Sequence, residues 1–307
     1  MANPLFPPPV KPGDTIGIVA PSGQIRDKQQ FESGVHILKD MGLSVRFPNE
    51  LWPGSGYFSD NDQNRAREFN RTWADPDIKA VIAARGGYGC IRILDRIDLD
   101  LIRKTPKLLL GFSDITIFHS YLQQKTGLVS LHGPVVTSLA LSDKIARDRF
   151  NHCLLGKWTR EIDARHIEIL RGGPPVQGIL VGGNLSSIQS LLGTPFQPDW
   201  KDKIVFLEDT GEPFYRLDRM LTQFFYSGMF NGITGLILGD FSYDLSQSSI
   251  QRQRLQESVW ERILTLTARS GIPVWGDFPI GHCVNNLTLP IGAVSCMDSK
   301  RAILSFN

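Results

Sequence analysis

The chain has 307 residues, enough for two domains of ordinary size and for a sizeable buried core. Hydrophobic residues make up 41% and charged residues 21%, as is typical of globular proteins that fold in water. The formal net charge is only +2 and the basic residues are scattered, which argues against a nucleic-acid-binding protein.

The sequence also argues against a metal site, a disulfide framework and a membrane span. The four cysteines are widely separated without a CxxC pair, and no HExxH motif is present, so we expect no metal and no cofactor. The start, MANPLFPPPVKPGD, has no basic segment followed by an apolar run, and no stretch reaches ~18 apolar residues. We therefore expect a cytoplasmic protein that does not span a membrane.

The first half of the chain alternates short apolar stretches with amphipathic ones, after an extended, proline-rich lead-in. The predicted strands are 15–23 (with a Pro-Ser-Gly turn at its end), 43–47, 80–85 and 107–111, and the predicted helices are 28–41, 60–73 and 115–124. Buried strands that alternate with helices indicate a parallel sheet covered on both faces, in a flavodoxin-like or Rossmann-like domain.

A charge-rich segment that ends in Gly-Gly-Pro-Pro interrupts this rhythm. It divides the chain into an N-terminal α/β domain (1–150), a linker (151–175) and a C-terminal domain (176–307). In the last part we expect strands at 177–184, 203–209 and 235–241, helices at 186–193, 215–225 and 249–269, and a terminal hairpin. The fold class is therefore α/β, with a parallel-sheet domain followed by a mixed α/β domain.

Three unusual turns follow predicted strands: APSG, RGGYG and GFSD. In parallel sheets, binding residues gather at the carboxyl ends of the strands. In GFSD, Ser113 could be a nucleophile on a sharp strand-to-helix turn, although Ile115 stands where GxSxG has its second glycine. Ser113 or Asp114 could equally be an ordinary helix N-cap.

RGGYG is only weak evidence for a phosphate-binding loop, because it does not match GxGxxG and the P-loop lysine is missing. Gly86 and Gly87 would allow backbone N–H groups to approach a ligand, which suits an oxyanion hole as well as a phosphate. A simple tight turn is the alternative.

Carboxylates and a histidine appear in two later turns. Glu208, Asp209 and Glu212 in LEDTGEP could orient a histidine, cap the next helix or pair with nearby arginines. Of the six histidines, His282 lies in a loop after a glycine, which makes it a candidate general base.

Taken together, these stretches resemble the LD-carboxypeptidases, a family of serine peptidases that also contains the microcin C immunity hydrolases. The resemblance runs through nearly the whole chain in the family's order: VAPSG, ARGGYG, GFSDIT, GGNLSSIQSLLGTP, LEDTGEPFYRLDRML and a late GH.

The resemblance implies a Ser–Glu–His triad with Ser113 as nucleophile, Glu208 as orienting acid and His282 as base. Ser113 would then lie on one domain and its partners on the other, with the active site in the cleft between the two domains.

The resemblance also assigns supporting residues. Asp114 would contribute its backbone N–H to the oxyanion hole, and the turn of Gly86 and Gly87 would supply another donor. Arg85 is a candidate to bind the substrate carboxylate, and a structural role in the turn is the alternative.

The implied reaction removes the terminal D-alanine from murein tetrapeptide, at the L-centre of the diamino acid, through an acyl-enzyme. The family acts in cell-wall peptide recycling, normally as a cytoplasmic homodimer. Two alternatives remain open: a microcin-C-type hydrolase of aminoacyl-nucleotide amides, and a non-catalytic two-domain binding protein.

Overall fold

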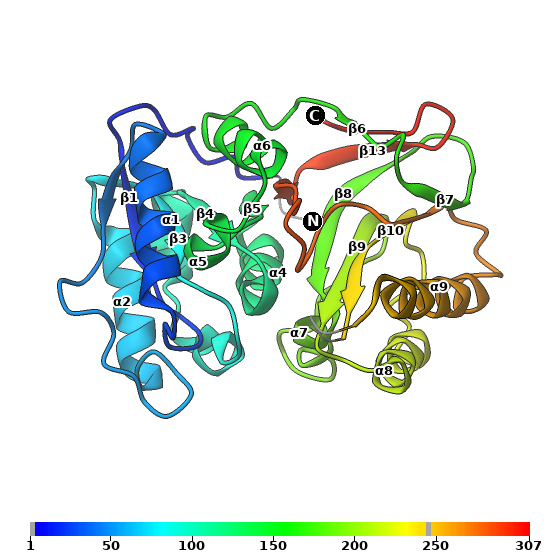
Figure 1. The fold of residues 1–307 in the computed structure, drawn as a ribbon, viewed down its shortest axis with the longest axis horizontal. Helices are drawn as coiled ribbons and strands as arrows, with labels where there is room; N and C mark the ends of the chain where they lie inside the picture. The colour runs from blue at the N-terminus through cyan, green and yellow to red at the C-terminus, as the bar shows by residue number, and fades with distance from the viewer. Residues whose placement is uncertain (1–3, 244–246) are drawn as a thin grey trace. The chain divides into compact units, whose positions relative to one another are not determined.

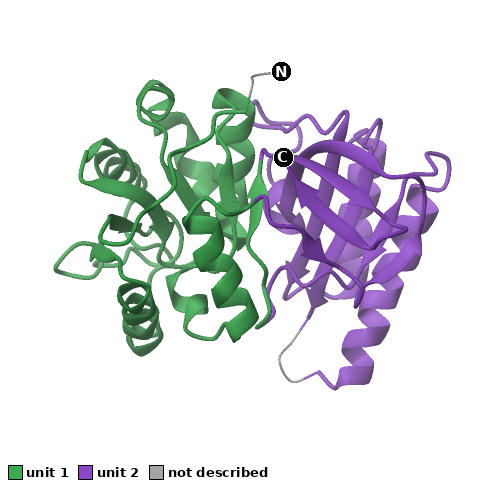
Figure 2. Ribbon diagram, turned by 90° about the horizontal axis from the view of Figure 1, so that it is seen from above, with its two compact units in different colours: residues 1–158, 284–291 green, residues 159–283, 292–307 purple. Residues whose placement is uncertain are grey.

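The computed structural model describes residues 4–243 and 247–307, which form two compact units. Unit 1 comprises Met1–Trp158 and Val284–Ile291, and unit 2 comprises Thr159–Cys283 and Gly292–Asn307. The elements are labelled in Figure 1, and Figure 2 shows the two units in different colours. The chain therefore passes between the units three times, and each unit is described in turn.

Unit 1 is built on a six-stranded sheet with the order β12-β5-β4-β3-β1-β2. Its strands are β1 (Thr15–Val19), β2 (Ser44–Arg46), β3 (Ile78–Ala83), β4 (Leu108–Gly111), β5 (Ser130–His132) and β12 (Leu289–Ile291). The first five are parallel, and β12 pairs antiparallel with β5. The turns after β1, β3 and β4 therefore lie at one edge of the sheet, side by side, because these three strands are neighbours.

The helices of unit 1 cover both faces of this sheet (Figure 1). They are α1 (Lys28–Asp40), α2 (Asp62–Ala74), the 3-10 helix η1 (Cys90–Arg96), α3 (Leu99–Lys104), the 3-10 helix η2 (Ser113–Ile115), α4 (Thr116–Thr126), α5 (Val136–Leu139) and α6 (Lys144–Leu154). Phe31 of α1 and Phe150 of α6 join one core cluster with the strands. Phe69 of α2 contacts Phe118 of α4 with ring centroids 4.8 Å apart.

Unit 2 is built on an eight-stranded sheet with the order β6-β14-β13-β8-β9-β10-β11-β7. Its strands are β6 (Ile162–Asp163), β7 (Glu168–Arg171), β8 (Val176–Asn184), β9 (Lys203–Thr210), β10 (Gly235–Ser242), β11 (Val274–Gly276), β13 (Val294–Asp298) and β14 (Ile303–Phe306). The central strands β8 to β11 are parallel, and antiparallel strands flank them on both sides. This is the mixed sheet, with a β13–β14 hairpin at the end of the chain, that the alternating tail predicts.

The helices in the described part of unit 2 are α7 (Leu185–Gln189), α8 (Phe214–Tyr226) and α9 (Ser249–Leu266). The apolar faces of α8 and α9 form one core cluster with β8, β9 and β10. Helix α9 begins at a capping box of Ser248 and Gln251. Arg262 of α9 pairs with Asp218 of α8 at 2.5 Å, which joins the two helices.

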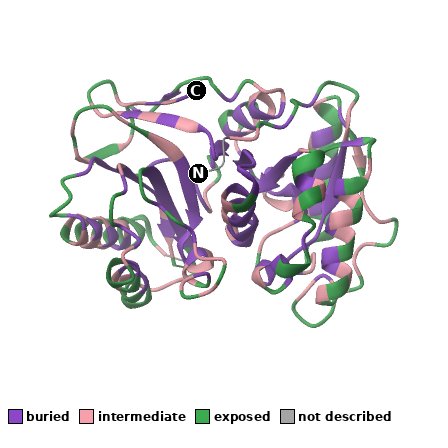
Figure 3. Ribbon diagram, turned by 180° about the vertical axis from the view of Figure 1, so that it is seen from behind, coloured by how far each residue is buried: buried purple, intermediate pink, exposed green. Residues whose placement is uncertain are grey.

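The predicted fold class is confirmed: a parallel-sheet α/β unit and a mixed α/β unit. The burial pattern agrees with this architecture, since the strands are largely buried and the outward helix faces are exposed (Figure 3). None of the helices in the described ranges is long and apolar enough to cross a membrane.

The organisation differs from the expectation at three places. The expected linker, 151–175, holds the end of α6 and the strands β6 and β7. The expected C-terminal domain is not continuous, because 284–291 returns to unit 1. Helix α7 ends at Gln189 rather than near residue 193. Short strands and segments that alternate between units carry no periodic signal of their own, so local patterns miss them.

Candidate active site

Ser113 occupies a strained backbone position at the end of a buried strand. All four residues of β4 are buried, Phe112 continues in an extended conformation, and Ser113 then turns to φ +63°. A residue other than glycine or asparagine adopts this left-handed region at an energetic cost, and such strain clusters at functional sites. A sharp turn between strand and helix is how a nucleophilic serine is presented above a sheet.

The helix-cap alternative does not describe this turn. The N-cap positions of η2 and α4 are Phe112 and Ile115, and neither provides a side-chain cap. The carboxylate of Asp114 instead accepts hydrogen bonds from the Ser22 hydroxyl and the Cys90 backbone N–H. The polar residues of GFSD are therefore engaged in contacts between turns.

The turn after β3 comes very close to Ser113. A Cβ atom added to Gly86 would lie 2.7 Å from Ser113 Cβ and 2.9 Å from its Oγ, so only glycine fits there without a shift. Gly87 has φ +127°, which also favours glycine. No acceptor among the described residues takes a hydrogen bond from the backbone N–H of Gly86, Gly87 or Asp114. These N–H groups are suitable donors for a developing oxyanion.

Arg85 holds the same turn in place. Its Nη1 donates to the Gln24 carbonyl at 2.8 Å, and its Nε donates to the Gly86 carbonyl at 3.2 Å. These bonds provide the structural role that was the alternative for this residue. The third nitrogen, Nη2, donates to no described residue.

Arg65 is a contributor that the sequence analysis missed. Its side chain is buried and donates to the carbonyls of Pro21 and Gly89, which lie in the turns after β1 and β3. An arginine in a polar helix carries no local signal of such a role. Ser22, also missed, lies in the APSG turn, which the sequence did mark as unusual.

In unit 2, Glu208 and His282 form a close pair. His282 Nδ1 lies 2.8 Å from Glu208 Oε2, and the glutamate side chain is fully buried while that of His282 is 22% exposed. Because an ionised carboxylate only accepts hydrogen bonds, Nδ1 carries the proton in this pair and Nε2 is the basic nitrogen.

Two glycines make room for this pair. A Cβ atom on Gly281 would lie 2.8 Å from Glu208 Oε2, and Gly281 has φ +111°. A Cβ atom on Gly239 would lie 3.2 Å from Glu208 Cβ. The glycine that precedes His282 is thus required both by backbone conformation and by the close approach of the carboxylate.

The other two carboxylates of LEDTGEP have different partners. Asp209 accepts hydrogen bonds from Ser186 N at 2.9 Å, Ser186 Oγ at 2.6 Å and Asn184 Nδ2 at 3.1 Å, so it joins the end of β9 to the start of α7. Burial, followed by the charge of Glu208, raises the pKa of Asp209 to about 6. Glu212 pairs with Arg216 at 3.3 Å.

The pKa of His282 reflects two opposing influences. Burial lowers the pKa, but the Glu208 carboxylate, through its charge and hydrogen bond, and the charges of Asp209 and Asp240 together raise it above the ordinary value. Asp240 belongs to β10, and its backbone N–H donates to the Ile280 carbonyl at 2.9 Å, two residues before His282. His282 is therefore a stronger base than a free imidazole.

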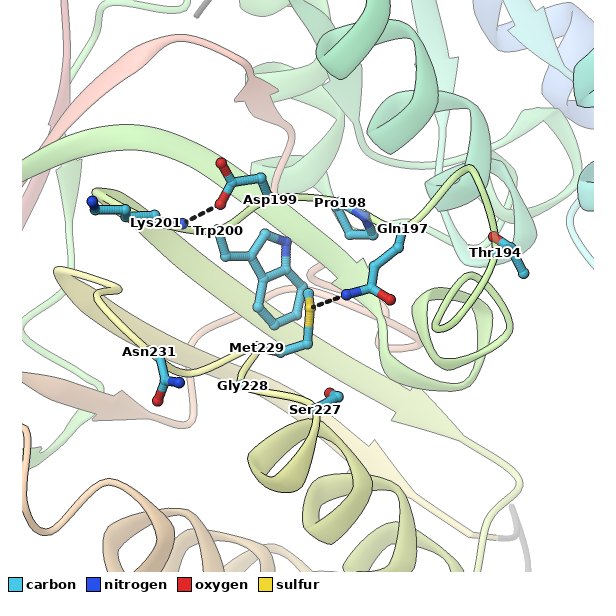
Figure 4. Close-up of a pocket in the computed structure, with 10 residues that line it drawn as sticks. All are labelled: Thr194, Gln197, Pro198, Asp199, Trp200, Lys201, Ser227, Gly228, Met229 and Asn231. Carbon is cyan, nitrogen blue, oxygen red and sulfur yellow. Dashed lines mark hydrogen bonds between the residues drawn. The ribbon is translucent and has the colours of Figure 1, made fainter.

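A separate open depression of about 410 Å³ lies in unit 2 (Figure 4). Trp200, Met229 and Gln197 line it, and Gln197 Nε2 lies 3.8 Å from Met229 Sδ. None of the candidate catalytic residues is part of this lining. Among the described residues, no group of three or more His, Cys, Asp or Glu side chains is placed to hold a metal ion.

A parallel α/β sheet with a strained serine at a strand end, together with a histidine held by a buried carboxylate, is typical of serine hydrolases. Comparison with known proteins assigns the chain more closely. Residues 16–133 match the family model of the LD-carboxypeptidase N-terminal domain, and residues 177–297 match that of the LD-carboxypeptidase C-terminal domain.

Individual relatives are similar to the chain over nearly its whole length. The chain is 34% identical to the "Probable murein peptide carboxypeptidase" of Bacillus subtilis, over 97% of this chain and 93% of that protein. The structure is similar to that of the muramoyltetrapeptide carboxypeptidase from Oxalobacter formigenes, with a TM-score of 0.80, 31% identity and coverage of 95% and 97% of the two chains. It is also similar to that of an MccF-like protein from Bacillus anthracis, with a TM-score of 0.86, 25% identity and coverage of 98% and 99%.

The chain belongs to the LD-carboxypeptidase family, and it is a serine-type carboxypeptidase.

Proposed function

We propose that this enzyme releases the terminal D-alanine from murein tetrapeptide by hydrolysing the LD-peptide bond. The observation that carries the proposal is Ser113 at φ +63° directly after β4, with Gly86 packed closely against it. The Bacillus subtilis and Oxalobacter formigenes relatives, named for murein peptide and muramoyltetrapeptide substrates, support this choice of substrate.

In the proposed mechanism, Ser113 from unit 1 acts with the Glu208–His282 pair of unit 2. His282 Nε2 takes the hydroxyl proton as Ser113 attacks the amide carbonyl, and Glu208 stabilises the imidazolium through Nδ1–H. His282 then gives the proton to the departing amine of D-alanine. Water then attacks the acyl carbonyl with His282 again as base. The bond from Ser113 Oγ to the acyl group breaks, the tripeptide leaves as a carboxylic acid, and His282 returns the proton to Ser113 Oγ.

The backbone N–H groups of Gly86, Gly87 and Asp114 would bind the oxyanion in both steps. Removing one such donor typically costs ~3 kcal/mol of transition-state stabilisation. The substrate also carries a free carboxylate. Arg85, whose Nη2 has no described acceptor, is our candidate for binding it.

The test is incubation of the purified enzyme with murein tetrapeptide, with mass spectrometry to detect tripeptide and released D-alanine. We expect turnover by the wild type and a loss of at least ~10³-fold in Ser113→Ala, which retains the fold but has no nucleophile. Unchanged turnover in Ser113→Ala, or no D-alanine release by the wild type, would contradict the proposal.

A microcin-C-type hydrolase is the second candidate, because the MccF-like structure aligns with 98% of this chain. Processed microcin is therefore the second substrate in the same assay. Cleavage of the aminoacyl-nucleotide amide with no release of D-alanine from murein tetrapeptide would favour this candidate.

We also propose that the enzyme is a cytoplasmic homodimer, as the family resemblance implies. Light scattering coupled to size-exclusion chromatography would give a mass near twice the 34.3 kDa of the chain. Cell fractionation with an antibody would test the compartment. A monomeric mass at micromolar concentration would contradict the proposed homodimer. Recovery of the protein outside the cytoplasmic fraction would contradict the proposed location.

A further inference from the structure

The carboxylate of Asp114 joins three turns of unit 1. Ser22, in the turn after β1, donates its hydroxyl to Asp114 Oδ2 at 2.6 Å. Cys90, which ends the glycine turn after β3, donates its backbone N–H to the same oxygen at 2.9 Å. Asp114 itself directly follows Ser113 in the turn after β4. A single oxygen atom therefore connects the three turns in which the nucleophile and the oxyanion donors lie.

These three groups are shielded from water. Ser22 and Cys90 are fully buried, and Asp114 is 2% exposed. Hydrogen bonds to a charged group are stronger than neutral ones, and a buried partner that loses its bond is left unsatisfied. These two hydrogen bonds, from Ser22 and Cys90 to Asp114, form a bridge between the turns. The bridge therefore has one favoured geometry, and it constrains the surrounding turns.

The bridge sets the position of the glycine turn relative to Ser113. Arg85 holds the start of this turn through the Gln24 carbonyl, and the Cys90 N–H holds its end through Asp114. A Cβ atom built on Gly87 would lie 3.4 Å from Ser22 Oγ, so the hydroxyl also adjoins the middle of the turn. Displacement of the bridge would change the distance between the oxyanion donors and the attacked carbonyl.

We propose that Ser22 is a positioning residue for the carboxypeptidase reaction. Its hydroxyl orients the Asp114 carboxylate, which in turn holds the Gly86–Gly87 turn beside Ser113. This inference depends on the proposed function, in which Ser113 is the nucleophile and the turn binds the oxyanion. Ser22 contacts no reacting atom in this scheme, so its loss acts through Asp114.

The fold is expected to tolerate loss of the Ser22 hydroxyl. Arg65 connects the same two turns independently, since it donates to the carbonyls of Pro21 and Gly89. This second connection separates the effect on catalysis from an effect on folding.

The experiment compares Ser22→Thr with Ser22→Val, two variants of equal size of which only the first keeps a hydroxyl. Ser22→Ala removes the hydroxyl without adding volume. Ser142→Ala is the matched control, because Ser142 is a buried serine of the same unit whose hydroxyl, among the residues that the structure describes, bonds only to the Ser138 carbonyl. For each variant, kcat and KM with murein tetrapeptide, the rate of labelling by a fluorophosphonate probe and the thermal unfolding midpoint are measured.

We expect kcat to fall about ten- to a hundredfold in Ser22→Ala and Ser22→Val, with KM changed less than about threefold, because small misplacement of catalytic groups has effects of this size. Labelling should slow in parallel, Ser22→Thr should recover most of kcat, and Ser142→Ala should behave as the wild type. Equal kcat in Ser22→Thr and Ser22→Val, or wild-type kcat in Ser22→Ala, would overturn the inference.

Ser113→Ala in the same assay separates this inference from the proposed function. An inactive Ser113→Ala with a fully active Ser22→Ala would reject only the positioning role. An active Ser113→Ala would reject the nucleophile assignment itself. If the valine and threonine variants fail to fold, they are replaced by Asp114→Asn, which preserves the shape of the side chain and an acceptor oxygen. Wild-type kcat in both Asp114→Asn and Ser22→Ala would reject the inference. A lower kcat in both variants would support it.

Discussion

Glu208 Oε2 lies 2.8 Å from Nδ1 of His282, although the two residues are 74 positions apart in the chain. The glutamate is fully buried, and the close approach of Gly281 leaves its carboxylate little freedom to turn. The pair therefore fixes the imidazole tautomer and makes Nε2 the proton acceptor.

Glu208→Gln tests this tautomer control. The amide keeps the size of the side chain, but its NH2 group can donate to Nδ1 and so favour the unproductive tautomer. It also has no negative charge to stabilise the imidazolium. We expect kcat to fall by ~10³–10⁴-fold with little change in KM. Steady-state kinetics on murein tetrapeptide checks this, with the exposed Glu261→Gln on α9 as control. Activity within about tenfold of the wild type would contradict the role of Glu208.

Asp240→Asn should shift the pH dependence of the reaction. His282 acts as a base only when neutral, so kcat/KM rises as the pH passes through the pKa of its imidazole. The charge of Asp240 is one of those that raise this pKa, so its removal lowers the pKa and moves the acidic limb to lower pH. We expect the acidic limb to move to lower pH, with the plateau of kcat/KM nearly unchanged. An unmoved limb, or one displaced to higher pH, would show that Asp240 does not act on His282.

Gly86→Ala should block the approach of the glycine turn to Ser113. Gly86 does not have a positive φ, so alanine is tolerated by the backbone and the effect comes from the new Cβ, 2.7 Å from Ser113 Cβ. We expect kcat/KM to fall by ~10²–10³-fold through loss of oxyanion contacts. Gly172→Ala is the control, since the nearest atom to a Cβ there is 3.9 Å away. Equal kinetics for the two variants would rule out this close contact as a requirement.

Glu68→Gln concerns stability rather than catalysis. Glu68 Oε1 accepts a hydrogen bond from Trp52 Nε1 at 2.6 Å, and burial raises the pKa of this carboxyl to about 7. For an acid with a raised pKa, the contribution to stability is present below the unfolded value of about 4.5 and is lost as the pH rises through 7. Glutamine accepts the same hydrogen bond without ionising.

The variant should therefore match the wild type near pH 4.5 and exceed its free energy of unfolding by about 1–3 kcal/mol near pH 8.5. Urea unfolding at the two pH values measures this, again with Glu261→Gln as control. A difference that does not depend on pH would mean that Glu68 does not titrate in this range.

Local patterns were sufficient for much of the fold. Apolar stretches such as 107–111 and 235–241 predict the buried strands β4 and β10, and helical periodicity predicts α1 and α8. They fail for β6, β7 and β12, which contain only two to four residues each. These segments lack the continuous apolar run that marks β4, which is equally short, so they cannot be distinguished from loops.

The sequence by itself determined the α/β class and marked the turns that carry Ser113, Gly86 and His282, because turn conformations and strand periodicity depend on neighbouring residues. Local patterns left three carboxylates open as partners of His282, and the family resemblance implied Glu208. Only the tertiary structure shows that Glu208 and His282 are in contact, and that Asp114 binds Ser22 and Cys90 instead of capping a helix. Such contacts join groups up to 92 residues apart. Strand order and the close approach of glycines bring them together, and neither is encoded in a local stretch of sequence.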